Sequence, residues 1–116
     1  MSKEEFEEFV TKEFPKAVPE KFRHLIKNVV FLVEDDSEEL LGLYHGVPKD
    51  ARGSYYGVGA TLPDTITLFQ KPIEDEALRS GQSVCSVIRD TIWHEVGHHF
   101  GLDEYEVRSR EEKRKV

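Results

Sequence analysis

The strongest constraint on the fold is a helix-forming segment after Ser83 that also carries most of the histidines of the chain. Ser83 is a suitable N-cap for this helix. Three of the five histidines, His94, His98 and His99, fall at its far end. The apolar residues recur every four positions, which places them in one stripe along a helix: Val84, Ile88, Ile92 and Val96. The segment is therefore predicted to pack along one side, with imidazoles at the edge of the packed stripe.

His94 and His98 are placed to bind one metal ion. At about 100° per residue, two positions four apart lie about 40° from each other and one turn displaced on a helix. Both imidazoles can therefore reach the same ion, and neutral imidazole binds Zn²⁺ well. The run His94-Glu95-Val96-Gly97-His98 matches H-E-x-x-H, a pattern typical of zinc-dependent proteases.

Glu95 is predicted to be the general base of such a site. It lies about 60° from His98 around the helix axis, close enough to act on a water molecule without binding the ion. A carboxylate there can take a proton from water and return it to a leaving amine. Tyr55 or Tyr56 would be able to donate a hydrogen bond to a developing oxyanion, or would simply cover a small core.

A third ligand is expected from the acidic pair Asp103 and Glu104. Gly101 is placed to end the helix in a left-handed conformation and to turn the chain back towards the ion. Neighbouring side chains in a turn diverge, so only one of the pair is expected to bind. Aspartate is the better N-cap and glutamate has the longer reach, which favours Glu104 as the metal ligand and Asp103 as the cap of a following helix. Asp103 is the alternative ligand.

The other candidate ligands are predicted to have structural roles. His99 lies about 100° from His98, off the ligand face, and is expected to be a packing or surface residue. His24 and His45 are isolated and are interpreted as structural histidines, with His45 alternatively lining the site as a polar group. Cys85 lies on the apolar side of the helix, so we expect it to be buried rather than to act as a thiolate ligand.

The first half of the chain predicts two helices and two strands. Ser2 and Glu5 form a capping-box pattern at the start of a helix that Pro15 is expected to end. A short second helix is predicted from about Pro19. Strands are predicted over residues 29–34 and 40–44.

Residues 64–73 are predicted to form a half-buried strand at a sheet edge. Ile66 and Leu68 alternate with Thr65, Thr67 and Phe69, and a proline in the strand is tolerated at an edge. Since an exposed strand can hold a peptide by pairing with it, Thr67, Leu68 and Phe69 are expected to border a substrate cleft. Helices over residues 73–79 and from residue 83 complete an α+β pattern.

Length and charge restrict the class of protein. The 116 residues suit one domain over residues 1–116. The longest apolar run, Val29–Val33, is far shorter than the roughly 20 residues of a membrane-spanning helix, and the acidic N-terminus lacks the basic start of a secretory signal. We therefore expect a cytoplasmic protein that does not bind membranes. The net charge of -7 disfavours nucleic acid as a partner.

The segment His94 to Glu104 resembles the extended H-E-x-x-H-x-x-G-x-x-[H/D/E] signature of zincins, and the chain is similar to the minimal zincin-like family of small bacterial metallopeptidases. The resemblance extends to residues 42–48 and 62–73 and covers most of the chain from about Val29 to Glu106. It implies a reduced zincin-like fold, in which a small mixed sheet packs on the active-site helix between N- and C-terminal helices. It also implies a zinc peptidase acting on a peptide or protein substrate, with Glu104 at the third-ligand position. Two features differ from larger zincins. The third-ligand position holds a carboxylate instead of a histidine, and the single methionine is Met1, so no methionine-containing turn can lie beneath the metal.

Two other functions compete with peptide hydrolysis. A bacterial ribonuclease family also has histidines four apart on a helix, but it resembles H-G-x-x-H, whereas Glu95 stands at the second position here. A structural zinc site normally closes all four positions with protein ligands, usually including cysteine. The single cysteine, Cys85, is predicted to face away from the histidines.

Overall fold

The computed structural model describes residues 1–23, 26, 28–46 and 63–100. Within these ranges the chain forms four helices and three strands. In chain order they are α1 (Lys3–Ala17), α2 (Glu20–Arg23), β1 (Val29–Glu34), β2 (Gly42–His45), β3 (Asp64–Phe69), α3 (Gln70–Ser80) and α4 (Val84–His99).

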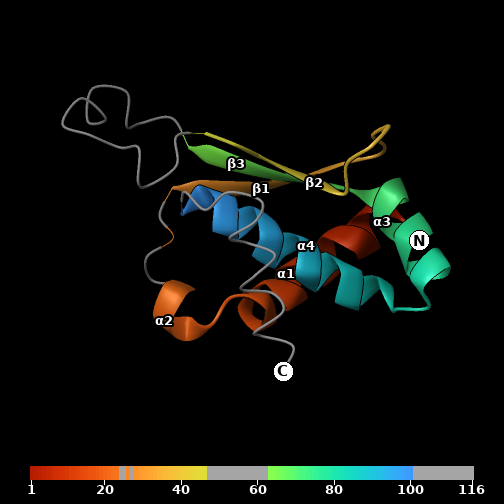
Figure 1. Cartoon of the computed structure of the whole chain (residues 1–116), viewed down its shortest axis with the longest axis horizontal. Coiled ribbons are helices and arrows are strands. Elements are labelled where there is room, and N and C mark those ends of the chain that lie inside the picture. Colours follow the sequence, from red (N-terminus) through yellow and green to blue (C-terminus); the bar gives the residue numbers. More distant parts are fainter. Residues whose placement is uncertain (24–25, 27, 47–62, 101–116) are drawn as a thin grey trace.

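The three strands form one mixed sheet, and α1 and α4 cover one of its faces (Figure 1). The strand order is β1-β3-β2, with β1 parallel and β2 antiparallel to β3. The described residues therefore confirm the predicted α+β class with a small mixed sheet packed on the helix that carries the histidines. The predicted C-terminal helix falls on residues outside the described ranges.

Helix α4 is the element around which the described structure packs. Ser83 caps it as predicted, because its hydroxyl accepts the Ser86 backbone N–H at 3.0 Å. Ile88, Ile92 and Val96 are buried, as the stripe predicted, and α4 contacts α1, α3, β2 and β3. With 16 residues α4 is the longest of the described helices, none of which is long and apolar enough to cross a membrane.

Helix α1 begins as predicted but ends later. Both hydrogen bonds of the Ser2–Glu5 capping box are present. The prediction that Pro15 ends the helix is wrong, because α1 continues to Ala17. A proline removes one hydrogen-bond donor, and here Ala17 and Val18 follow it into fully buried positions. Their packing outweighs the local cost of the proline.

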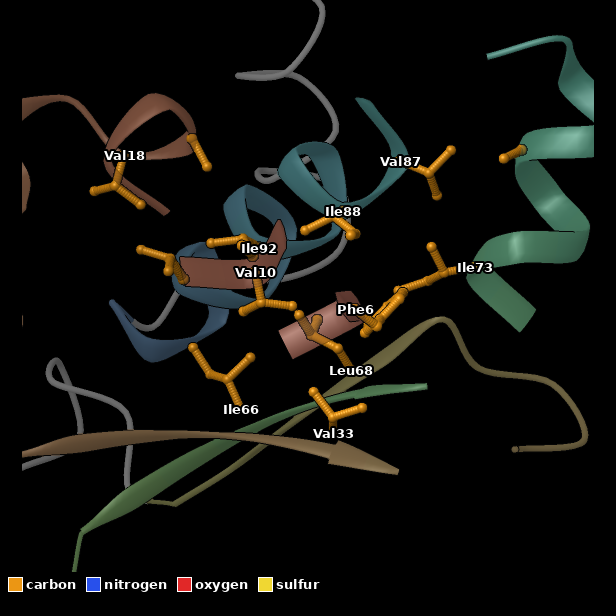
Figure 2. Packing of buried hydrophobic residues seen from close by; sticks show 13 residues of the cluster. Phe6, Val10, Val18, Val33, Ile66, Leu68, Ile73, Val87, Ile88 and Ile92 are labelled. Carbon is orange, nitrogen blue, oxygen red and sulfur yellow. The ribbon is translucent and has the colours of Figure 1, made fainter. Parts of the chain in front are cut away.

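The core lies between the sheet and the two long helices (Figure 2). Ile66 and Leu68 of β3 and Val33 of β1 point from the sheet towards Phe6 on α1 and Ile92 on α4. The alternation predicted for β3 is confirmed, since Asp64, Ile66 and Leu68 are buried and the residues between them are half-buried. The alternation of side chains along β3 thus determines which of them face α4.

The position of β3 in the sheet differs from the prediction. β3 is the central strand, paired with β1 on one side and β2 on the other, so it is not an edge strand. It also ends at Phe69, and Pro72 lies in the first turn of α3, where a missing N–H costs little. Thr67, Leu68 and Phe69 therefore cannot pair with a peptide, because their main chain already pairs within the sheet. Among the described strands, the edge nearest α4 is β2.

Candidate metal centre

His94 and His98 lie side by side on the last turns of α4, as the four-residue spacing predicted. Their ring centres are 5.1 Å apart, with an interplanar angle of 72°, and both side chains are half-buried. Two imidazoles on one tetrahedral ion, each with a metal–nitrogen distance of about 2.0–2.1 Å, have ring centres about 5 Å apart. The separation of the two rings is therefore compatible with the binding of one zinc ion.

Glu95 projects from the same helix towards β2. Its carboxylate is buried, with 7% of the residue exposed, and its Oε1 accepts the backbone N–H of Tyr44 at 2.9 Å. A carboxylate removed from water needs such donors, because an unsatisfied buried polar group is costly. The contact fixes the orientation of Glu95 beside the two histidines, and it joins residues 51 positions apart.

Gly42 lets β2 approach α4 closely enough to make this contact. A Cβ atom at this position would lie 2.7 Å from Thr91 Cγ2 and 3.3 Å from Glu95 Cγ. The first of these distances is too short for two carbon atoms, and the second is tight, since carbon atoms are normally in contact at about 3.5–4.0 Å. The absence of a side chain at Gly42 therefore determines how near the strand lies to Glu95.

Replacing Gly42 by alanine is expected to destabilise the protein by about 1–3 kcal/mol, the range typical of overpacking a dense core. Chemical denaturation would measure the change in the free energy of unfolding. Thr91→Ser removes the methyl group nearest the new Cβ and keeps the hydroxyl that donates to the Val87 carbonyl. The double variant should recover part of the loss, and strictly additive effects would show that this contact is not the cause.

His99, which was predicted to be a packing or surface residue, is completely buried at the end of α4. Its Nδ1 lies 2.9 Å from Asp64 Oδ2, and the Tyr44 hydroxyl donates to the same oxygen at 2.7 Å. The Tyr44 and His99 rings also meet edge to face, with centres 5.7 Å apart. One carboxylate oxygen thus connects the last residue of α4, the first residue of β3 and the middle of β2.

Three other residues lie away from this cluster or remain only partly buried. His45 is exposed and alternates with Tyr44 along β2, so it lies on the opposite face of the sheet and does not line the site. Cys85 is half-buried rather than buried, and it is at the far end of α4 from the histidines. Trp93, on the same helix, is half-buried and packs near Phe22, with 6.4 Å between the ring centres.

The described residues supply two of the three predicted metal ligands. Among them no group of three or more histidine, cysteine, aspartate or glutamate side chains could hold an ion. The predicted third ligand and several other candidates lie outside the described residues: His24, Tyr55, Tyr56, Gly101, Asp103 and Glu104.

Sequence reasoning missed Tyr44 and Asp64 as parts of the site. Both lie in segments that share the resemblance to the zincin-like family, but the sequence alone assigns neither residue a role. A signal was present for Asp64, because it lies two and four positions before Ile66 and Leu68 and therefore on the same face of β3. A carboxylate on the inward side of a strand is rarely buried without a partner. No comparable signal existed for Tyr44, whose contribution to Glu95 is a main-chain N–H.

A helix that presents H-E-x-x-H beside the edge of a mixed sheet defines a zincin-like class of protein. Comparison with protein families agrees, because the family model described as zincin-like metallopeptidase matches residues 22–114. The chain therefore belongs to the zincin-like metallopeptidase family. No curated protein matches it significantly.

Proposed function

We propose that the protein is a zinc-dependent peptidase, with His94, His98 and Glu104 as metal ligands and Glu95 as general base. The observation that carries the proposal is the placement of Glu95, which is buried, follows a histidine of the pair and accepts the Tyr44 N–H at 2.9 Å. A glutamate that only contributed to a water-exposed helix surface would not need a buried carboxylate with a defined orientation. Membership of the zincin-like metallopeptidase family supports the same reaction class.

The reaction assigns separate roles to the residues of the site. When bound, zinc supplies Lewis acidity, which polarises a peptide carbonyl and lowers the pKa of a water ligand to about 7. Glu95 takes a proton from the attacking water while the new carbon–oxygen bond forms at the carbonyl carbon. It returns this proton to the amine as the peptide carbon–nitrogen bond breaks. His94 and His98 hold the ion on a rigid, packed helix.

The peptide substrate is proposed to lie along β2. In the antiparallel ladder the Leu41 carbonyl accepts the Phe69 N–H at 2.9 Å, so the alternation directs the main-chain groups of Gly42 and the Tyr44 carbonyl away from β3, where a peptide can reach them. The Tyr44 N–H also points away from β3, but Glu95 already accepts it. An extended peptide can add to a strand edge of this kind. The peptide would still bind by pairing with an exposed strand, as expected from the sequence, but the strand is β2 instead of β3.

Metal analysis and an unbiased digest test the proposal together. Purified protein should contain about one zinc per chain by elemental analysis, and zinc-loaded protein should cleave members of a random peptide library detected by mass spectrometry. Removal of the metal with a chelator should stop cleavage, and added zinc should restore it. Cleavage that persists without metal would contradict the proposal, as would a zinc-loaded protein that leaves the library intact.

Replacing Glu104 by alanine is expected to weaken zinc binding much more than replacing Asp103. The longer side chain has the reach to bind the ion, while aspartate is better suited to capping the following helix. Competition with a chromophoric chelator would give the two dissociation constants. The opposite ranking would transfer the ligand assignment to Asp103.

A further inference from the structure

Tyr44 contacts the site through two different parts of the residue. Its backbone N–H donates to Glu95 Oε1 at 2.9 Å, and its hydroxyl donates to Asp64 Oδ2 at 2.7 Å. The first contact lies at the edge of the sheet and the second lies in the interior. The conformation of this one residue therefore couples the buried carboxylate of Asp64 to the orientation of Glu95.

Asp64 and His99 form a rigid anchor for the Tyr44 ring. The Asp64 side chain is 4% exposed and that of His99 is 0% exposed. The carboxylate form of Asp64 has no proton to give, so both Tyr44 Oη and His99 Nδ1 donate to it. Buried charge is expensive unless it is hydrogen-bonded, and these two donors compensate Asp64 Oδ2. The Tyr44 hydroxyl therefore contributes to stabilising the buried carboxylate of Asp64.

The surrounding backbone has little room to shift. A Cβ atom at Gly46 would lie 2.3 Å from Asp64 Oδ1, so the end of β2 packs directly on the other oxygen of the same carboxylate. At the opposite end of β2, Gly42 packs against Thr91 and Glu95. Tyr44 thus lies between two close contacts of the chain, one at Gly42 and one at Gly46.

We propose that Tyr44 is a positioning residue for Glu95, anchored by the Asp64–His99 pair. This role rests on the proposed function, since it matters only where Glu95 acts on a water molecule. A carboxylate group is planar, so holding Oε1 on the Tyr44 N–H also restricts the directions that Oε2 can take. Catalytic groups need placement to within about 0.5 Å and 10–20°, and a hydrogen bond from a constrained strand provides this better than a mobile side chain does.

The first test measures the Tyr44 amide by NMR hydrogen exchange in metal-free protein, and therefore depends on neither zinc nor turnover. Tyr44→Phe, which keeps the ring and loses the anchor, is expected to accelerate exchange of amide 44 at least about 10-fold. The amides of residues 43 and 45, which the ladder alternation directs towards β3, should change less than about 3-fold. Asp64→Asn should act in the same direction.

Two further variants separate positioning from general destabilisation. Thr65→Val removes a hydroxyl from the opposite face of the same strand pair, where it contacts the His45 carbonyl at 3.5 Å, and should leave amide 44 unchanged. In a Glu95→Ala background, which lacks the acceptor, Tyr44→Phe should cause no further acceleration. Unchanged exchange of amide 44 in Tyr44→Phe would overturn the proposal. Equal acceleration of amides 43, 44 and 45 would do so as well.

Turnover provides the second test and distinguishes failure of this inference from failure of the proposed function. With a peptide taken from the library digest, Tyr44→Phe is expected to lower kcat about 10-fold with KM nearly unchanged, within the range found for residues that orient a site. A raised KM at unchanged kcat would contradict a positioning role. A wild-type protein without any peptidase activity would instead refute the proposed function, while the exchange experiment would still report on the Tyr44–Glu95 contact.

Discussion

Glu95→Gln is expected to lower the rate of peptide hydrolysis by about 10²–10⁴-fold, the contribution typical of a general acid–base residue, while zinc binding is retained. Glutamine has nearly the same shape, and its amide oxygen can still accept the Tyr44 N–H that Glu95 accepts at 2.9 Å. The variant therefore removes proton transfer and leaves the geometry in place. Initial cleavage rates and zinc content, measured on the same preparation, check both parts of the expectation.

Asp75→Asn is the matched control for this experiment. It makes the same carboxylate-to-amide change on α3, where Asp75 is exposed and pairs with Lys71 at 3.3 Å. Exposed ion pairs contribute little to stability, so activity and zinc binding should equal those of the wild type. Undiminished hydrolysis by zinc-loaded Glu95→Gln would refute the assigned role of Glu95.

His94→Ala and His98→Ala are each expected to weaken zinc binding by more than about 100-fold. Loss of a residue that only orients a ligand costs about 10–100-fold, and loss of a direct ligand should exceed this. Because the two rings, with centres 5.1 Å apart, are proposed to hold one ion, each variant should also lose hydrolysis. Competition titrations with a chelator would measure the dissociation constants.

His45→Ala is the control for the histidine variants. His45 is exposed and lies on the other face of β2 from Tyr44, so its loss should change zinc affinity less than about 3-fold. A similar loss of affinity in His45→Ala and His94→Ala would contradict the assignment of the metal centre to α4.

Much of the fold could be predicted because its signals are local. The Ser2–Glu5 capping box, the Ser83 cap and the apolar stripe of α4 each depend on residues within a few positions of one another, and all three are present. The errors at Pro15 and in the strand predicted over residues 64–73 have a common origin. In both places local preference competed with burial or strand pairing, and partners distant in the sequence decided the outcome.

The relation between His94, Glu95 and His98 was determined by the sequence alone, because helix periodicity places side chains four apart on one face whatever the rest of the chain does. The tertiary structure decided the surroundings of that motif. The sheet order made β2 the strand beside α4, the Gly42 main chain allowed its close approach, and the Tyr44 N–H oriented Glu95. It also brought Asp64 to His99, 35 positions away. Such contacts depend on strand order, register and main-chain direction, which no local pattern of side chains specifies.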